Sequence, residues 1–216
     1  MVNSSMPSAL TYLFDPLCGW CYGASPVVQQ LAQHHTIHLE LAPTGLFSGA
    51  GGRVMDTSFA AYAWSNDKRI QQLTGQRFAE VYLTQVLGKT GVRFDSGAVT
   101  LALTAVSLTE PQRELASLKL LQEARYVQGQ DTSELSIVAN ILHEHSLVPA
   151  AELLLAGDKQ LKTANNSRVQ QAQQLMQSLG AQGVPALVLN QNGSQRLLRS
   201  DLLFGNIEAL LASIAV

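Results

Sequence analysis

The chain has 216 residues, 46% of them hydrophobic, so it can bury a substantial core in one large domain or in one domain that carries an insertion. Its formal net charge is −2, and no basic run is present, so nucleic acid is not expected as a partner. The apolar stretches are far shorter than the roughly 20 residues that cross a bilayer, so no membrane partner is expected either.

The first ten residues, Met1 to Leu10, contain no Lys or Arg and no long apolar run. A secretory signal needs both features. The sequence as given therefore predicts a cytoplasmic protein, with a leader already removed as the alternative.

The first element expected is a short buried strand from Ala9 to Phe14, which ends at an Asp15-Pro16 turn. Apolar residues at helical spacing follow, so a helix is expected from about Cys18, with a kink near Pro26. Alternating polar and apolar residues from 36 to 41 then predict a second strand.

The only two cysteines, Cys18 and Cys21, lie in a Cys-Gly-Trp-Cys stretch at the junction between the first strand and the helix. A βαβ context of this kind favours a redox role for the pair. Zinc is the alternative, but tetrahedral zinc needs four ligands, and the histidines could supply the others only from a distance. No metal is therefore expected.

Residues 51–180 show helical periodicity and no convincing alternation, which predicts an all-helical segment. Candidate helix starts are Asn66-Asp67, Asp95-Ser96 and Thr132-Ser133. Gly129 and Gly180 are candidate helix ends.

The chain then returns to strands. Residues 184–189 predict one strand, Asn192-Gly193 predicts a two-residue hairpin turn, and residues 195–198 predict the partner strand. Ser200-Asp201 is expected to cap a last helix. The predicted class is α/β, in the order βαβ, helical insertion, ββα.

This order resembles the DsbA-like branch of the thioredoxin superfamily, in particular the cytosolic FrnE-like proteins. The resemblance rests on residues 14–21 (Phe-Asp-Pro-Leu-Cys-Gly-Trp-Cys) after the first strand and residues 183–185 (Gly-Val-Pro) before the third. It implies a thioredoxin fold with a large helical insertion. The expected domains are a thioredoxin-like unit of residues 1–50 and 181–216 and an inserted unit of residues 51–180.

The resemblance also implies site residues. Pro185 would be cis and face the disulfide, and the backbone of Val184 would pair with an extended substrate; an ordinary trans proline on an edge strand is the alternative. Gly19-Trp20 replaces the Pro-His of strongly oxidising DsbA proteins, so oxidising strength is not carried over.

The expected chemistry is dithiol–disulfide exchange. Unpaired N–H groups at a helix start stabilise a thiolate, so Cys18 would attack, and Cys21, one turn further on, would resolve the mixed disulfide. Trp20 would line a substrate groove or pack against the insertion. Asp15 is expected to be a turn or capping residue without a catalytic part; the alternative is a charged carboxylate that points inward and raises the pKa of Cys18. Phe47 is a candidate for a substrate surface.

A reductase or isomerase is favoured over an oxidase, with no cofactor. The expected partners are protein or small-molecule thiols and disulfides, glutathione among them. The alternative is a glutathione-dependent transferase or isomerase of the kappa or hydroxychromene carboxylate isomerase type, although those proteins usually carry Ser where Cys18 stands. A third hypothesis is a binding module with a structural or metal-holding motif.

Overall fold

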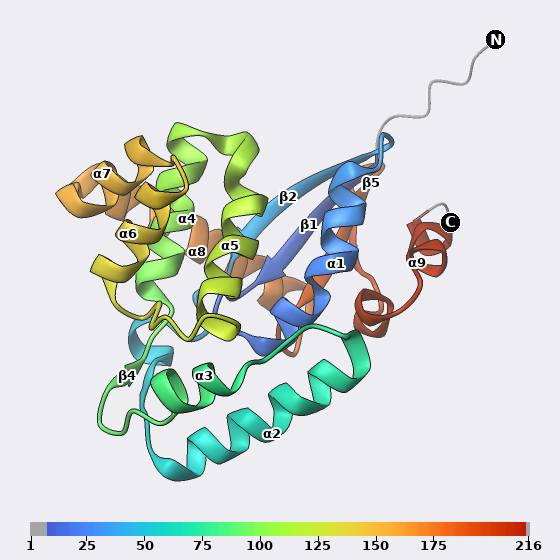
Figure 1. Ribbon diagram of the computed structural model, residues 1–216. Helices are drawn as coiled ribbons and strands as arrows, with labels where there is room; N and C mark the ends of the chain where they lie inside the picture. Colours follow the sequence, from blue (N-terminus) through green and yellow to red (C-terminus); the bar gives the residue numbers. More distant parts are fainter. Residues whose placement is uncertain (1–7, 215–216) are drawn as a thin grey trace.

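The computed structural model describes residues 8–214 and has a four-stranded sheet at its centre (Figure 1). The strand order is β2-β1-β5-β6. β1 and β2 run parallel, whereas β5 is antiparallel to β1 and β6 is antiparallel to β5. The strands are β1 (Ser8–Phe14), β2 (Ile37–Pro43), β5 (Ala186–Gln191) and β6 (Ser194–Leu197).

Strand β1 is buried because it lies in the interior of the sheet, with Leu10, Leu13 and Phe14 each 0% exposed. A parallel neighbour requires a crossover connection, and helix α1 (Gly19–Gln33) supplies it between β1 and β2. The predicted βαβ opening is thus confirmed. The cysteines follow shortly after the carboxyl end of β1.

The remaining helices belong mostly to the insertion. In Figure 1, α4 to α7 gather beside the sheet, and α2 runs across the end of the molecule where α1 begins. Their bounds are α2 (Thr57–Thr74), α3 (Glu80–Tyr82), α4 (Gly97–Thr109), α5 (Glu114–Tyr126), α6 (Leu135–Glu144), α7 (Val148–Ala156), α8 (Lys159–Leu179) and, at the end of the chain, α9 (Ile207–Ile214).

The insertion is mainly but not entirely helical, which corrects the expectation of an all-helical segment. β3 (Arg53–Val54) and β4 (Arg93–Phe94) form a small antiparallel pair. Strands of two residues are too short to show alternation, so periodicity could not reveal them.

The helix expected to begin at Asn66-Asp67 begins ten residues earlier, so that prediction was wrong. Asp56 caps α2, with its Oδ1 accepting a hydrogen bond from the Phe59 N–H at 2.7 Å, and Asp67 lies buried in the middle of the helix. Gly75, at φ 76°, ends α2.

Two other helix starts differ from prediction. Ser200-Asp201 opens a short 3-10 segment, and α9 begins only at Ile207. α6 begins at Leu135 with Glu134 at its N-cap, just after Thr132-Ser133.

Several local predictions are confirmed. Ser96 is the N-cap of α4, and Gly180 ends α8 in the left-handed conformation. Asn192 and Gly193, at φ 52° and 76°, form the tight turn between β5 and β6. The signals at Gly180, Asn192 and Gly193 worked because each depends on a left-handed backbone conformation that few residue types adopt, and Ser96 is of a residue type that is common at helix starts.

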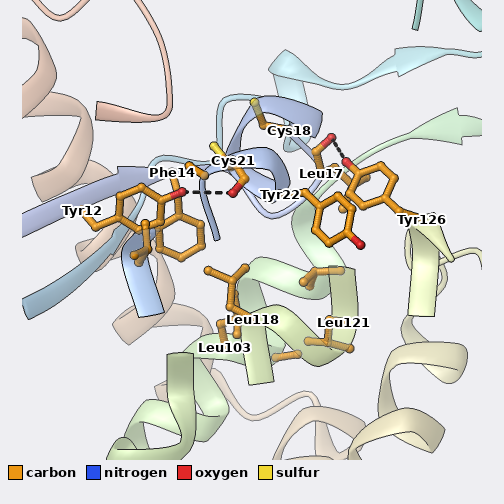
Figure 2. Packing of buried hydrophobic residues seen from close by; sticks show 14 of the residues in the cluster. Tyr12, Phe14, Leu17, Cys18, Cys21, Tyr22, Leu103, Leu118, Leu121 and Tyr126 are labelled. Atoms are coloured by element: carbon orange, nitrogen blue, oxygen red, sulfur yellow. Dashed lines mark hydrogen bonds between the residues drawn. The ribbon is translucent and has the colours of Figure 1, made fainter. Parts of the chain in front are cut away.

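One hydrophobic core joins the sheet, α1 and the insertion. In Figure 2, the Tyr126 hydroxyl from α5 reaches the backbone beside the cysteines, where it donates a hydrogen bond to the Leu17 carbonyl at 2.7 Å. Within residues 8–214, no helix is long and apolar enough to span a bilayer. The expectation of no leader concerns Met1 to Leu10, and residues 1–7 lie outside the described part of the chain.

Candidate active site

Cys18 occupies the N-cap position of α1. Its backbone is extended, at φ −80° and ψ 117°, and its N–H donates to the Asp15 carbonyl at 3.1 Å, which closes the turn after β1. The side chain is 7% exposed. Cys18 thus stands at the N-terminus of a 15-residue helix, where the helix dipole favours negative charge, although its side chain forms no hydrogen bond to the first N–H groups.

Val184 and Pro185 lie opposite Cys18, although 166 residues separate Cys18 from Val184 in the sequence. The Val184–Pro185 peptide bond is cis, and the Cys18 Sγ donates a hydrogen bond to the Val184 carbonyl at 3.6 Å. Both residues line a groove of about 520 Å³, whose wall also includes Trp20. The fold therefore brings together the residues that the sequence singled out.

Cys21 lies one turn into α1 and is 1% exposed. Figure 2 shows the two sulfurs at the same end of the helix. Burial, and then the neighbouring Cys18, raise the pKa of the Cys21 thiol well above its ordinary value. Cys21 is therefore the protonated, sheltered partner of the pair, and Cys18 is the one that borders a cavity.

Asp15 is completely buried and fully hydrogen-bonded, as a turn residue should be. Its Oδ1 accepts from the Leu17 N–H at 2.9 Å, and its Oδ2 accepts from the Phe47 N–H at 3.0 Å and from the Ser96 hydroxyl at 2.8 Å. Burial raises the pKa of Asp15, and these donors oppose the rise. Through these hydrogen bonds, Asp15 holds the turn that precedes Cys18 against the loop after β2 and the start of α4.

Trp20 packs between the C-terminal segment and the insertion and also lines cavities. Its ring packs edge-on against Phe204 with centroids 5.2 Å apart, and the Arg69 guanidinium of α2 lies 5.9 Å from its centroid. Trp20 also lines both the groove beside Val184 and a second cavity. It forms a partition between them.

The second cavity, of about 250 Å³, lies between the start of α1, helix α2 and the loop after β2. Phe47 forms part of its wall, which places this candidate residue beside Cys18. Sequence reasoning missed Asp67, Tyr82 and Tyr126, which also line it. One signal was available: Asp67 precedes the apolar Ile70 by three residues on a helix, so it shares a largely buried face.

No cluster of three or more His, Cys, Asp or Glu side chains in residues 8–214 is arranged to hold a metal ion. The described residues of the site thus offer sulfur, a backbone carbonyl, aromatic rings and the single carboxylate of Asp67.

Comparison with known proteins places this geometry in context. Residues 9–209 match the family described as DSBA-like thioredoxin domain. Among solved structures, the cytosolic disulfide reductase DsbM from Pseudomonas aeruginosa is 29% identical with a TM-score of 0.84, and the match covers 96% of this chain and 97% of that one. A second DsbM structure, with GSH, is 28% identical with a TM-score of 0.82 and coverage of 96% and 100%.

Two further likenesses bear on the fold alone. A candidate protein disulfide isomerase from Nitrosomonas europaea is 21% identical, with a TM-score of 0.77 and coverage of 95% of this chain and 96% of that one. A 2-hydroxychromene-2-carboxylate isomerase is 14% identical, with a TM-score of 0.58 and coverage of 96% of both chains. No curated protein matches the sequence.

Proposed function

Because the chain belongs to the DSBA-like thioredoxin domain family of thiol–disulfide oxidoreductases, we propose that it is a disulfide reductase that acts through Cys18 and Cys21. The observation that carries the proposal is the position of the Cys18 sulfur, at the N-terminus of α1 and 3.6 Å from the carbonyl of Val184, a residue that lines the groove, while Cys18 itself borders the second cavity. The 29% identity to a disulfide reductase over nearly the whole chain supports reduction as the direction.

The proposed reaction has two exchange steps. The Cys18 thiolate attacks one sulfur of a substrate disulfide, so a Cys18–substrate bond forms and the other substrate sulfur leaves as a thiolate. Cys21 then loses its proton and attacks the Cys18 sulfur, which releases the second substrate thiol. Two electrons pass from the dithiol to the substrate, and the Cys18–Cys21 disulfide remains.

The residues around the sulfurs have separate tasks in this scheme. Val184 presents a carbonyl to which an extended substrate backbone can bind beside Cys18, and Pro185 holds the turn of that segment. Trp20 supplies an apolar wall of the groove. Burial keeps Cys21 in its protonated form until the mixed disulfide is in place.

The partner proposed for recycling is glutathione, in the cytosol. A DsbM structure contains GSH, and DsbM is described as cytosolic. Two glutathione molecules would reduce the Cys18–Cys21 disulfide and leave as glutathione disulfide, so no further cofactor enters the cycle.

The testing experiment is a redox equilibrium in glutathione buffers of graded ratio, with free thiols measured by alkylation. For the wild-type protein we expect one two-electron transition with a midpoint in the reducing range. In assays of disulfide reduction, Cys18→Ser should lose turnover, and Cys21→Ser should accumulate a mixed disulfide. If no Cys18–Cys21 disulfide forms at any ratio, or if Cys18→Ser retains full activity, the proposal is wrong.

A further inference from the structure

The cavity on the far side of Trp20 from the Val184 groove has an unusual lining. Aromatic residues make up half of the residues that line it, and Cys18 borders it. Its volume of about 250 Å³ suits a fragment of a few heavy atoms rather than a peptide strand. The aromatic residues are Trp20, Phe47, Phe59, Tyr62, Tyr82, Phe94 and Tyr126.

Asp67 is the only acidic side chain that lines this cavity. The residue is 5% exposed, and its Oδ2 has no hydrogen-bond partner among residues 8–214. Its Oδ1 lies over Gly19, where the Cβ of any larger residue would overlap it. The glycine between the cysteines therefore makes room for a carboxylate from the insertion.

Three guanidinium groups already lie over aromatic rings of this cavity, but none of them forms a salt bridge with Asp67 among residues 8–214: Arg53 lies over Phe59, Arg69 over Trp20, and Arg125 over Tyr82 and Phe94. Arg125 pairs with Asp131, with Nη1 and Oδ1 3.5 Å apart. Arg53 pairs with Asp56, with Nη2 and Oδ2 3.4 Å apart. Burial raises the pKa of Asp67 to about 7, although the Tyr82 hydroxyl and the Arg125 guanidinium act in the opposite direction.

The Tyr82 hydroxyl is hydrogen-bonded to the Asp67 carboxyl group, but the Oδ2 atom has no hydrogen-bond partner among residues 8–214. A buried carboxylate oxygen without a partner is costly, and a cation relieves that cost. Aromatic faces attract cations as well, most of all where water is excluded. We propose that this cavity is a substrate subsite that selects disulfides carrying a primary ammonium group near the sulfur, with Asp67 as the residue that binds the ammonium. The inference rests on the proposed exchange reaction and names a substrate class for it.

The first exchange step is where the subsite acts. With an aminoalkyl disulfide, Cys18 attacks one sulfur while the ammonium of a substituent lies against Asp67; the Cys18–sulfur bond forms and an aminothiolate leaves. Cys21 then attacks the Cys18 sulfur and releases the second aminothiol, so the two electrons of the dithiol pass to the substrate sulfurs and the protein is left with a Cys18–Cys21 disulfide. Asp67 is therefore a specificity residue and exchanges no electrons.

The test uses pre-reduced protein in single turnover at pH 8, so that no recycling reductant is needed. Three probe disulfides are compared: cystamine, which is cationic, bis(2-hydroxyethyl) disulfide, which is neutral, and 3,3′-dithiodipropionate, which is anionic. Protein oxidation is followed by acid quench and alkylation. Because the probes differ in intrinsic reactivity, the measured quantity is the ratio of the wild-type rate constant to the Asp67→Asn rate constant for each probe.

We expect a ratio of about 10 for cystamine, which corresponds to about 1.4 kcal/mol, a ratio within twofold of 1 for the neutral probe, and a ratio below 1 for the anionic probe. Glu80→Gln is the matched control, because it removes one negative charge from an exposed side chain on α3. It should give ratios near 1 for all three probes.

If Asp67→Asn does not fold, inhibition of the wild-type protein still tests the proposed subsite. Butylammonium should then slow the reaction with cystamine, and butyrate should not. Equal losses on all three probes, unchanged rates, or no inhibition by butylammonium would overturn the subsite. If reduced wild-type protein reacts with none of the disulfides, the proposed function fails as well, which separates the two conclusions.

Discussion

Asp15 and Asp67 are both buried near the cysteines, yet they differ in how their charge is accommodated. Asp15 accepts three hydrogen bonds, from Leu17, Phe47 and Ser96. Asp67 has an oxygen without any partner in the described chain. A satisfied carboxylate stabilises its surroundings, whereas an unsatisfied one lowers stability, so natural chains retain the latter mostly where function requires it.

The stability of the protein should reveal this difference through its pH dependence. The pKa of Asp67 rises from 3.8 to about 7 on folding. Between these values the folded state binds more protons than the unfolded state, so the free energy of unfolding falls as pH rises through this window. Asp67→Asn stays neutral, so its stability relative to wild type should increase between pH 4 and pH 8 by a few kcal/mol, and by no more than about 4.

Urea denaturation of both proteins at the two pH values measures this effect. Glu80→Gln, an exposed carboxylate on α3, serves as the control and should show no such change. The stability difference between Asp67→Asn and wild type could instead be the same at pH 4 and pH 8. That result would show that folding does not raise the pKa of Asp67.

At the scale of elements, the sequence revealed what depends on a few neighbouring residues. The Asn192-Gly193 turn, the left-handed end at Gly180 and the cap at Ser96 follow from local backbone preferences. The start of α2 could not be predicted from local preferences, because Asn66-Asp67 and Asp56 are equally good helix caps by residue type. Only the tertiary packing of Asp67 decides between them.

The candidate site was predictable in part for the same reason. Cys18, Cys21 and the Val184-Pro185 segment stand in recognisable motifs, so a family resemblance could place them. The Gly19–Asp67 contact joins two segments 48 positions apart in sequence number and has no local signature. Only the packing of α2 on the start of α1 creates it.

That packing is tight enough to test. Gly23 of α1 faces α2, and a Cβ at this position would lie 2.6 Å from the Ile70 Cγ2. Ile70 is 1% exposed and β-branched, so it cannot easily move aside. Gly23→Ala should therefore lower the free energy of unfolding by about 1–3 kcal/mol, although alanine favours a helix by about 1 kcal/mol.

Chemical denaturation checks this prediction. Gly205→Ala is the matched control: a Cβ there would have no neighbour closer than 4.0 Å, and the φ of −120° suits any residue. Its stability should remain within about 0.5 kcal/mol of wild type. A stable Gly23→Ala would mean that the α1–α2 contact is looser than the structure indicates.

At the scale of the whole molecule, the insertion and the sheet share one core, so the two expected domains should unfold together. Arg168 of α8 is a polar link between these parts. Its guanidinium binds Glu114 of α5 at 2.6 Å, the Leu41 carbonyl of β2 at 3.1 Å, and the Thr104 hydroxyl of α4 at 3.2 Å. Two helices of the insertion and one strand of the sheet thus meet at this side chain.

Removal of the Arg168 guanidinium should show how much an unpaired buried charge lowers the free energy of unfolding. Arg168→Gln leaves Glu114, 8% exposed, without its cation, and should lower the free energy of unfolding by about 3 kcal/mol at pH 8. Burial already raises the pKa of Glu114 and Arg168 opposes the rise, so in the variant the pKa rises further. The loss should therefore shrink as the pH falls and Glu114 becomes protonated.

A double-mutant cycle with Glu114→Gln distinguishes this ion pair from mere lost packing. If the pair acts as described, Arg168→Gln should cost much less in the Glu114→Gln background, with a coupling energy of about 1–3 kcal/mol. The exposed Arg199–Asp201 pair offers the contrast, and Arg199→Gln should change stability little. Additive losses at Arg168 and Glu114 would assign the link to the backbone and hydroxyl contacts of Arg168 instead, and the insertion would then be held to the sheet chiefly by its apolar core.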